Sequence, residues 1–206
     1  MNGKAKEAGK MDEMLILVDR NDKPLGFDTK TRIHQIGALH RAFSIFIFDH
    51  QNRLLLQRRA LRKYHSAGLW SNSCCGHPRH GEELEAAVSR RLREEMGVDC
   101  QMRKVTALTY RAELPNGLIE HEYDHIFAGI LEGEPTANPD EVADWQWIPI
   151  DQVLDLVECQ PHDCTVWFRE ILGRARTEGL AQWRTISGSG SSLPAGGVPL
   201  SREVSH

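Results

Sequence analysis

The chain has 206 residues, of which 40% are hydrophobic and 26% are charged, a composition typical of one globular domain with or without tails. Its net charge of −4 gives no positive field that would attract nucleic acid. No apolar run approaches the roughly 20 residues that cross a membrane, so we expect a globular protein that binds neither nucleic acid nor a membrane.

The cysteines predict a reducing compartment. Their number, 5, is odd, and none forms a Cys-x-x-Cys pair, which argues against a disulfide framework and a zinc knuckle. The first residues are rich in Lys, Glu and Gly and lack the apolar centre of a secretory signal. We therefore expect reduced thiols and a cytoplasmic protein.

Composition also divides the chain into a domain and two tails. The C-terminal stretch is rich in Ser, Gly and Pro and has too little apolar surface to offset the entropy lost on ordering. We expect disordered tails at residues 1–12 and 186–206 and one folded domain at residues 13–185.

The first predicted elements are strands. Leu15–Asp19 reads as a short strand, followed by a turn at Asn21–Gly26. Two apolar runs, Arg41–Asp49 and Arg53–Arg58, are separated by three polar residues, His50-Gln51-Asn52. Such a pair of runs predicts a β-hairpin.

A helix follows. After Gly81, four apolar residues recur at every fourth position and so share one helix face: Leu84, Val88, Leu92 and Met96. Gly97 is a typical C-terminal stop.

The remaining segments complete the fold class. We expect strands at Val105–Glu113, Glu120–Leu131 and Trp145–Ile148, and helices from Ile150 and over Cys164–Gly179. Pro115-Asn116-Gly117 separates the first two of these strands. This order predicts an α+β fold in which mixed β-sheets are sandwiched by helices.

The most specific motif is Gly76–Val98. Gly76 is followed at set spacings by Glu82 and Arg90, and then by Leu92, Glu94, Glu95, Gly97 and Val98. This pattern resembles the Nudix box, a loop–helix–loop that presents glutamates to a divalent metal on a diphosphate. Mg²⁺ prefers such carboxylate oxygens and fills its other positions with phosphate and water. The alternative is a charged, solvent-exposed helix without function. It does not explain why the glycines, the glutamates and their spacing all match the Nudix box.

One position departs from the Nudix pattern. After Arg90 the box has a glutamate, whereas this chain has Arg91. The guanidinium replaces a metal-binding carboxylate with a bidentate phosphate donor. This substitution favours a site that holds a diphosphate without cleaving it.

Motifs around the box resemble type I isopentenyl diphosphate isomerase, a Nudix-fold enzyme. They are the string from Asn72 to Pro78, the segment His34–Phe43, and the segment Asn116–Ala128. The resemblance runs from about Leu15 to Gly179. It implies interconversion of isopentenyl and dimethylallyl diphosphate, in isoprenoid biosynthesis, through a tertiary carbocation.

Five residues form a candidate metal site. Glu120 and Glu122 alternate on a predicted strand and therefore point to one face. Together with His34, His40 and His77 they offer mixed imidazole and carboxylate ligands, which suit Zn²⁺ or Mn²⁺ better than Ca²⁺. A single histidine is more often structural, and we assign that role to the others: His50, His65, His80, His121, His125, His162 and His206.

The resemblance also assigns catalytic residues. Cys75 and Glu122 are the acid/base pair, and Tyr110 is the hydrogen-bonding partner of the glutamate. Trp167 stabilises the cation by its ring face, and Trp70 lines the pocket. We expect a neighbouring cation or His77 to lower the pKa of Cys75. The other cysteines, including the adjacent Cys74, are expected to be buried hydrophobes.

The diphosphate end needs cations. By resemblance these are Lys30, Arg59, Lys63 and Arg91, and Glu95 is the ligand of a Mg²⁺ ion that accompanies the diphosphate. The expected partner is thus a small-molecule substrate, and we expect a monomer. Two rival functions stay open at this point: a Nudix hydrolase of a nucleoside or prenyl diphosphate, and a non-catalytic Nudix-like binding module.

Overall fold

The structure, a computed structural model, describes residues 12–188. Most of the two predicted tails therefore lies outside the described residues. The last helix continues through Gly188, beyond the expected domain end at residue 185. No helix in the described range is long and apolar enough to cross a membrane. In chain order the principal elements are β1 (Met14–Val18), β2 (Pro24–Thr29), α1 (Lys30–Ile36), β3 (His40–Phe48), β4 (Arg53–Arg59), β5 (Trp70–Ser71), β6 (Cys74–Gly76), α2 (Leu84–Met96), β7 (Met102–Glu113), β8 (Ile119–Ile130), β9 (Val142–Pro149), α3 (Ile150–Cys159) and α4 (Val166–Gly188).

The strands form a mixed sheet around β3 and β8. These two central strands pair in parallel along their length, from His40 opposite Glu122 to Phe48 opposite Ile130. β7 pairs with β8 in antiparallel orientation and sets Tyr110 opposite Glu122. β6 pairs with β3, which places Cys75 beside Ser44. The register alone therefore brings an imidazole, a phenol and a carboxylate together.

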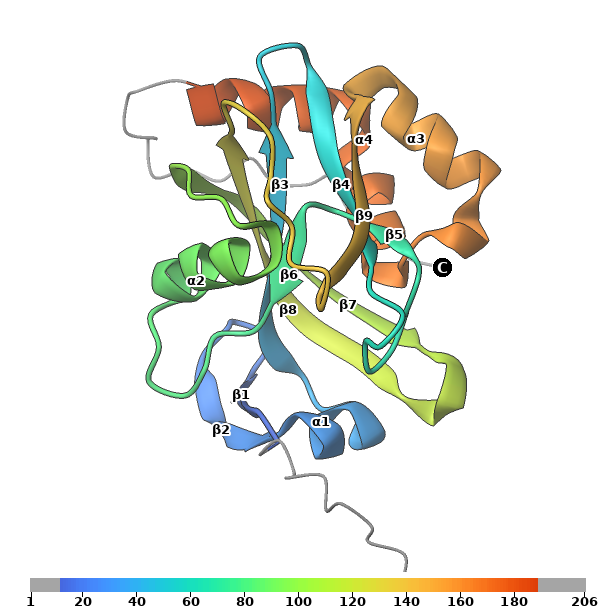
Figure 1. Ribbon diagram of the computed structural model, residues 1–206. Coiled ribbons are helices and arrows are strands. Elements are labelled where there is room, and N and C mark those ends of the chain that lie inside the picture. Colours follow the sequence, from blue (N-terminus) through green and yellow to red (C-terminus); the bar gives the residue numbers. More distant parts are fainter. Residues whose placement is uncertain (1–11, 189–206) are drawn as a thin grey trace, which may run out of the picture.

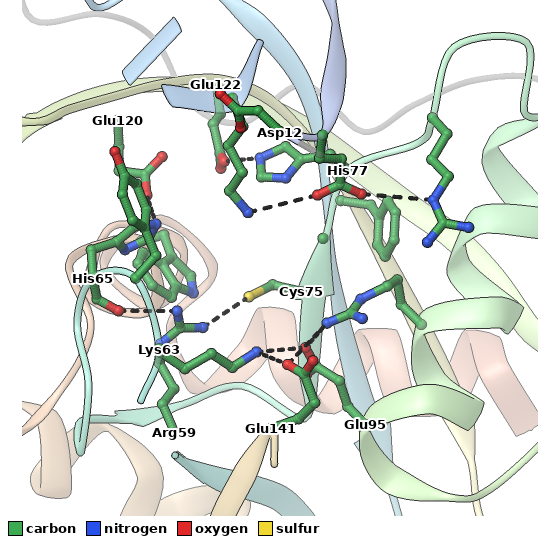
Figure 2. A pocket seen from close by; sticks show the side chains of 18 of the residues that line it. Asp12, Arg59, Lys63, His65, Cys75, His77, Glu95, Glu120, Glu122 and Glu141 are labelled. Carbon is green, nitrogen blue, oxygen red and sulfur yellow. Dashed lines mark hydrogen bonds and ion pairs between the residues drawn. The ribbon is translucent and has the colours of Figure 1, made fainter. Parts of the chain in front are cut away.

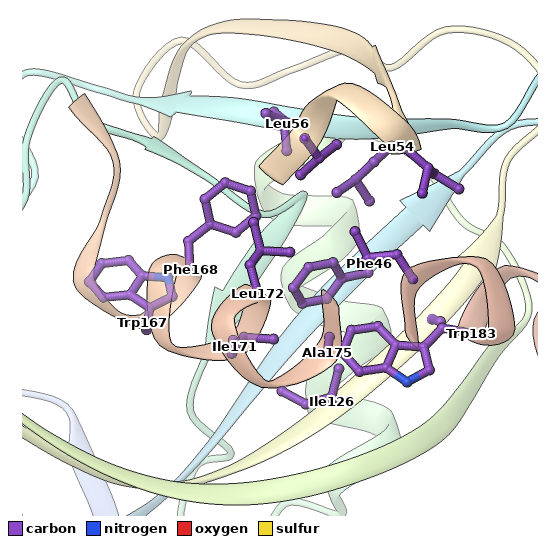
Figure 3. Close-up of a cluster of buried hydrophobic side chains, with 14 of the residues drawn as sticks. Phe46, Leu54, Leu56, Ile126, Trp167, Phe168, Ile171, Leu172, Ala175 and Trp183 are labelled. Atoms are coloured by element: carbon purple, nitrogen blue, oxygen red, sulfur yellow. The ribbon is translucent and has the colours of Figure 1, made fainter. Parts of the chain in front are cut away.

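Helices cover both faces of this sheet, as predicted. α2 lies on one face and α3 and α4 lie on the other (Figure 1). Because side chains alternate along a strand, Phe46 and Phe48 of β3 pack on the α4 side. Phe43, Ile45 and Ile47 pack on the α2 side. Figure 3 shows Phe46 and Ile126 packed against Phe168, Leu172 and Trp183 of α4.

α2 confirms the four-residue period. Its buried side carries Val88, Leu92 and Met96, and it ends at Gly97, whose φ of 67° is left-handed. A Cβ at Gly97 would lie 2.3 Å from the carbonyl oxygen of Thr136, so glycine is required there for both backbone angle and space. Glu95 is also on the buried side, with only 1% of its surface exposed.

Two local expectations about the strands need correction. β3 and β4 pair only at Phe48 and Leu54, because β4 separates from β3 and pairs with β9 instead. The expected hairpin is therefore confined to its turn. The expected turn at Asn21–Gly26 overlaps β2, an edge strand whose exposed residues show no alternation of apolar and polar side chains.

The helices differ in two further respects. α1 was not predicted, because seven residues with no apolar stripe give no periodic signal; it is capped by the Thr29 side chain and ends at the left-handed Gly37. The final helix was expected to end at Gly179 but continues to Gly188 past a kink at Arg176. Trp183, in this added part, packs on Phe46 with ring centroids 5.3 Å apart.

Candidate active site

A cavity of about 1050 Å³ lies beside β6 and β8, and most of the predicted site residues line it. Lining side chains from the predicted set are Lys30, Arg59, Lys63, Cys75, His77, Arg91, Glu95, Glu120, Glu122 and Trp167. His34, His40 and Tyr110 are buried next to it. Figure 2 shows Cys75 between the pair His77 and Glu122 and the group formed by Lys63, Glu95 and Glu141.

The five predicted metal ligands converge, although they come from four separate segments. The candidate ligand atoms of His34, His40 and His77 lie within 4.8 Å of one another, as do those of His40, Glu120 and Glu122. Nε2 of His34 is 3.3 Å from Oε2 of Glu120. Nε2 of His77 is 2.9 Å from Oε1 of Glu122.

The donor set fits a divalent metal. Nδ1 of His34 lies 2.7 Å from the carbonyl oxygen of Lys30, and Nδ1 of His40 lies 3.0 Å from that of Ala38. A carbonyl only accepts, so both rings carry their proton on Nδ1 and present the Nε2 lone pair to the cluster. These two Nε2 atoms and Oε2 of Glu120 are buried with no hydrogen-bond partner within residues 12–188, which is unusual unless an ion supplies one.

The pKa shifts of the ligand candidates agree with this fit. Burial and the charge of Glu122 raise the pKa of Glu120. Burial lowers the pKa of His34, but its contact with Glu120 outweighs that effect and the net pKa is raised. Burial lowers the pKa of His77 to about 3, so this ring is a neutral ligand at physiological pH.

Tyr110 is the predicted partner of Glu122. Its hydroxyl donates a hydrogen bond of 2.6 Å to Oε2 of this carboxylate. Burial opposes ionisation of Glu122, but its contacts with the His40 and His77 rings outweigh burial and hold its pKa well below the usual range. Glu122 is therefore ionised and fixed in orientation from both oxygens.

The two adjacent cysteines face opposite sides of β6. Cys74 is 0% exposed and belongs to the core on the α2 side, whereas Cys75 lines the cavity. The expected lowering of the Cys75 pKa is wrong in direction. Burial raises the pKa of Cys75 to about 12, despite the Arg59 guanidinium, whose Nη1 lies 3.9 Å from the sulfur. Cys75 therefore holds its proton at neutral pH.

Arg59 is buried and supports the cavity wall. Its guanidinium lies over the Trp167 ring, 5.1 Å from the centroid. Its other nitrogens donate to the carbonyl oxygens of His65 and Ser66. Trp167 is 3% exposed and donates its Nε1–H to Ser71. The predicted diphosphate contact Arg59 thus also fixes the loop of residues 60–69.

The opposite end of the cavity is a network of ion pairs. Lys63 and Arg91 both contact Oε1 of Glu95 and Oε2 of Glu141. Gln57 donates to the second oxygen of Glu95. Burial raises the pKa of Glu95, but Arg91 and Lys63 outweigh it and hold the pKa at about 2. Both oxygens of Glu95 therefore have partners already, and it lies apart from the histidine cluster.

Some residues differ from their predicted positions. Trp70, expected in the pocket, packs against the α4-side core on β5 and is not among the lining residues. The guanidinium of Arg91 is engaged by carboxylates, including Glu94. Glu141 lines the cavity and was missed, because one acidic residue before a strand carries no signal.

His65 was assigned a structural role but lines the cavity. Its Nε2 is 3.3 Å from Oε1 of Glu120. His80 also lines the cavity. His121 and His125 have structural contacts, with the Gly37 carbonyl and with Asp22, and His206 lies outside the described residues.

Comparisons with known proteins point to one family. A family model described as the NUDIX domain matches residues 38–168. The chain is 53% identical over 176 residues to isopentenyl-diphosphate Delta-isomerase 2 of Photorhabdus laumondii, which covers 85% of this chain and 99% of that protein. It is 52% identical over 179 residues to isopentenyl-diphosphate Delta-isomerase of Serratia proteamaculans, covering 87% of this chain and 100% of the relative.

Solved structures agree on the fold. DR0079 from Deinococcus radiodurans superposes with a TM-score of 0.66 at 20% identity, covering 80% of this chain and 99% of the other. The MutT protein from Methanosarcina mazei gives 0.55 at 18% identity, covering 70% and 94%. These likenesses confirm the predicted α+β Nudix fold.

Proposed function

Because the chain belongs to the isopentenyl-diphosphate Delta-isomerase family of Nudix-domain proteins, we propose that it interconverts isopentenyl and dimethylallyl diphosphate. The observation that carries this proposal within the structure is the pair Cys75 and Glu122 in one cavity whose far end holds Lys63 and Arg91. This arrangement suits a substrate with an alkene at one end and a diphosphate at the other.

The reaction needs two acid/base groups. Moving the double bond of an unactivated alkene requires a proton at one carbon and loss of a proton from another. Cys75 holds its proton at neutral pH, and Glu122 is ionised, so one group can give a proton while the other accepts one. Because the reaction is reversible, each group serves in both roles over the two directions. Tyr110 fixes the carboxylate through its hydrogen bond.

The intermediate is a tertiary carbocation, which water would trap as an alcohol. Trp167 is nearly fully buried and lines the cavity. Its ring already packs against the Arg59 guanidinium, so its π-electrons suit a positive charge. In our proposal Trp167 stabilises the carbocation and helps to exclude water.

The metal would be held by five residues, whose mixed nitrogen and oxygen donors favour Zn²⁺ or Mn²⁺: His34, His40, His77, Glu120 and Glu122. When bound, such an ion supplies positive charge that polarises the carboxylates and keeps them ionised. The diphosphate would bind Lys30, Arg59, Lys63 and Arg91. Mg²⁺ would enter as part of the substrate complex, and contact with Glu95 would then require Lys63 or Arg91 to move.

Hydrolysis is the less suitable alternative. A Nudix hydrolase needs its glutamates free for metal beside the scissile phosphate, whereas Arg91 occupies Glu94 and Glu95. A purely binding module would not need a cavity thiol opposite a hydrogen-bonded carboxylate.

We also propose that the protein acts as a monomer in the cytoplasm, consistent with five free thiols.

One experiment tests the function. The full chain is incubated with isopentenyl diphosphate and Mg²⁺ in D₂O, and proton NMR follows the reaction. Isomerisation gives dimethylallyl signals with deuterium incorporation. Phosphate release from an unchanged alkene would instead establish a hydrolase, and an unchanged spectrum would leave only binding.

A further inference from the structure

His65 does not belong to the family motifs, but its side chain contacts the cluster of predicted metal ligands. Its side chain is 11% exposed, and Nε2 lies 3.3 Å from Oε1 of Glu120. His34 lies equally close, 3.3 Å, to the other oxygen, Oε2. The Glu120 carboxylate is thus bracketed by two imidazoles, one at each oxygen.

The two oxygens have different surroundings. Oε2 belongs to the group of buried atoms without a hydrogen-bond partner in the described part of the chain, together with Nε2 of His34 and of His40. Those atoms mark where a metal ion would be bound. Oε1 is not in this group and lies 3.3 Å from Nε2 of His65. An ionised carboxylate only accepts, so a hydrogen bond across this contact requires the His65 proton on Nε2. Nδ1 can then accept from the Ser66 hydroxyl at 3.4 Å.

Contacts within the described residues hold the ring in place. Arg59 donates to the carbonyl oxygens of His65 and Ser66 at 3.1 and 3.2 Å. Ser66 has a φ of 51°, a left-handed angle that few non-glycine residues adopt without support. The imidazole meets Trp167 edge-on, with centroids 5.9 Å apart. The loop therefore presents the Nε2–H in one fixed direction.

We propose that His65 is a positioning residue that donates its Nε2–H to Oε1 of Glu120 and so turns Oε2 toward the metal. The candidate ligand atoms of His65, His34 and Glu120 lie within 4.8 Å of one another, so His65 could also be a direct ligand. In our proposal it stays outside the coordination sphere, because it contacts a different oxygen of Glu120 from the one beside His34. Hydrogen bonds of this kind to metal-binding carboxylates contribute about 10- to 100-fold in metal affinity. The inference rests on the metal site of the proposed function and adds a residue to it.

The test measures Zn²⁺ affinity of the full chain by competition with a coloured chelator. His65→Phe keeps an aromatic ring against Trp167 but removes the N–H, and should weaken Zn²⁺ binding about 10- to 100-fold. His65→Gln keeps an N–H donor and should stay within a few-fold of wild type. His162→Ala, an exposed position outside the cavity, is the matched control and should change nothing.

A second readout separates positioning from direct ligation. In Co²⁺-loaded protein, the d–d absorption bands of His65→Phe should keep their wild-type shape, because the ligand set is unchanged. Bands that report a lost ligand would overturn the proposal, as would Zn²⁺ affinity within twofold of wild type. His77→Ala is the reference: if it too leaves affinity unchanged, the metal site itself is wrong, whereas an effect at His77 alone refutes only the role of His65. No isoprenoid substrate is needed, so the result does not depend on the isomerase assignment.

Discussion

The two ends of the cavity both contain buried carboxylates but neutralise them differently. At one end, Glu120 and Glu122 face imidazoles, and Glu120 has a raised pKa. At the other end, Glu95 faces Lys63 and Arg91 and has a pKa of about 2. Burying a charge is costly unless it is paired. An added cation would therefore stabilise ionised Glu120, whereas Glu95 is already paired with Lys63 and Arg91.

The difference gives each end a distinct dependence. The imidazole end should lose its organisation when metal is removed. The guanidinium end should keep its structure without metal and should respond instead to anions that compete with Glu95 and Glu141 for the same cations. Each prediction below tests one side of this comparison.

Metal removal should have the largest effect. Dialysis against a strong chelator should abolish isomerisation, and added Zn²⁺ or Mn²⁺ should restore it, because the buried ligands then regain their cation. Elemental analysis of the active protein should find a transition metal, reduced in His77→Ala. Full activity in protein that contains no transition metal would contradict the assignment of this end.

Loss of either acid/base group should have the second largest effect on isomerisation. Cys75→Ala and Glu122→Gln should each lower kcat by at least about 100-fold, the low end for a positioned acid or base. Cys74→Ala is the matched control, since its side chain lies in the core on the opposite side of β6, and should change kcat only a few-fold. Steady-state kinetics with isopentenyl diphosphate measures both, and an essential Cys74 would invalidate the geometry.

The sequence was sufficient to predict those features of the fold and the site that depend on a local residue pattern. The period of α2, the alternation of Glu120 and Glu122, and the motif around Cys75 all specify side-chain direction along one element. The five predicted ligands and the Tyr110 partner followed from family motifs, and their side chains lie together in the structure.

The remaining features depend on contacts between distant segments. His65 reaches Glu120 from a loop whose path is set by Arg59, and Glu141 reaches Lys63 only after β9 pairs with β4. The direction of the Cys75 pKa could not be predicted either, because burial outweighs the nearby cation. α1 is too short to show a helical period.

Arg91→Glu should have an intermediate effect and tests the guanidinium end. Losing one charged hydrogen-bonding partner costs on the order of 1.5–3 kcal/mol, so kcat/KM should fall roughly 10- to 150-fold, mainly through KM. The kcat/KM of Arg91→Lys should lie between those of wild type and Arg91→Glu, because lysine keeps the charge but loses the bidentate geometry of the guanidinium. Wild-type kinetics in Arg91→Glu would show that this arginine contacts only neighbouring carboxylates and not the diphosphate.

The smallest effect is expected for substitution of Glu141. It tests whether Glu141 only pairs with Lys63 and Arg91 or binds the metal of the diphosphate complex. Oε2 of Glu141 contacts both Lys63 and Arg91, and its side chain is 24% exposed. If these carboxylates only occupy the cations until diphosphate arrives, Glu141→Gln should release them and tighten inorganic pyrophosphate binding. A partly exposed pair contributes about 0.2–1 kcal/mol, so calorimetry should find an increase of at most about fivefold. Glu158→Gln, on the exposed side of α3, should bind pyrophosphate like wild type. Weaker binding in Glu141→Gln, seen only with Mg²⁺ present, would mean that Glu141 holds the metal of the diphosphate complex, and the two ends would then differ less than their pKa values indicate.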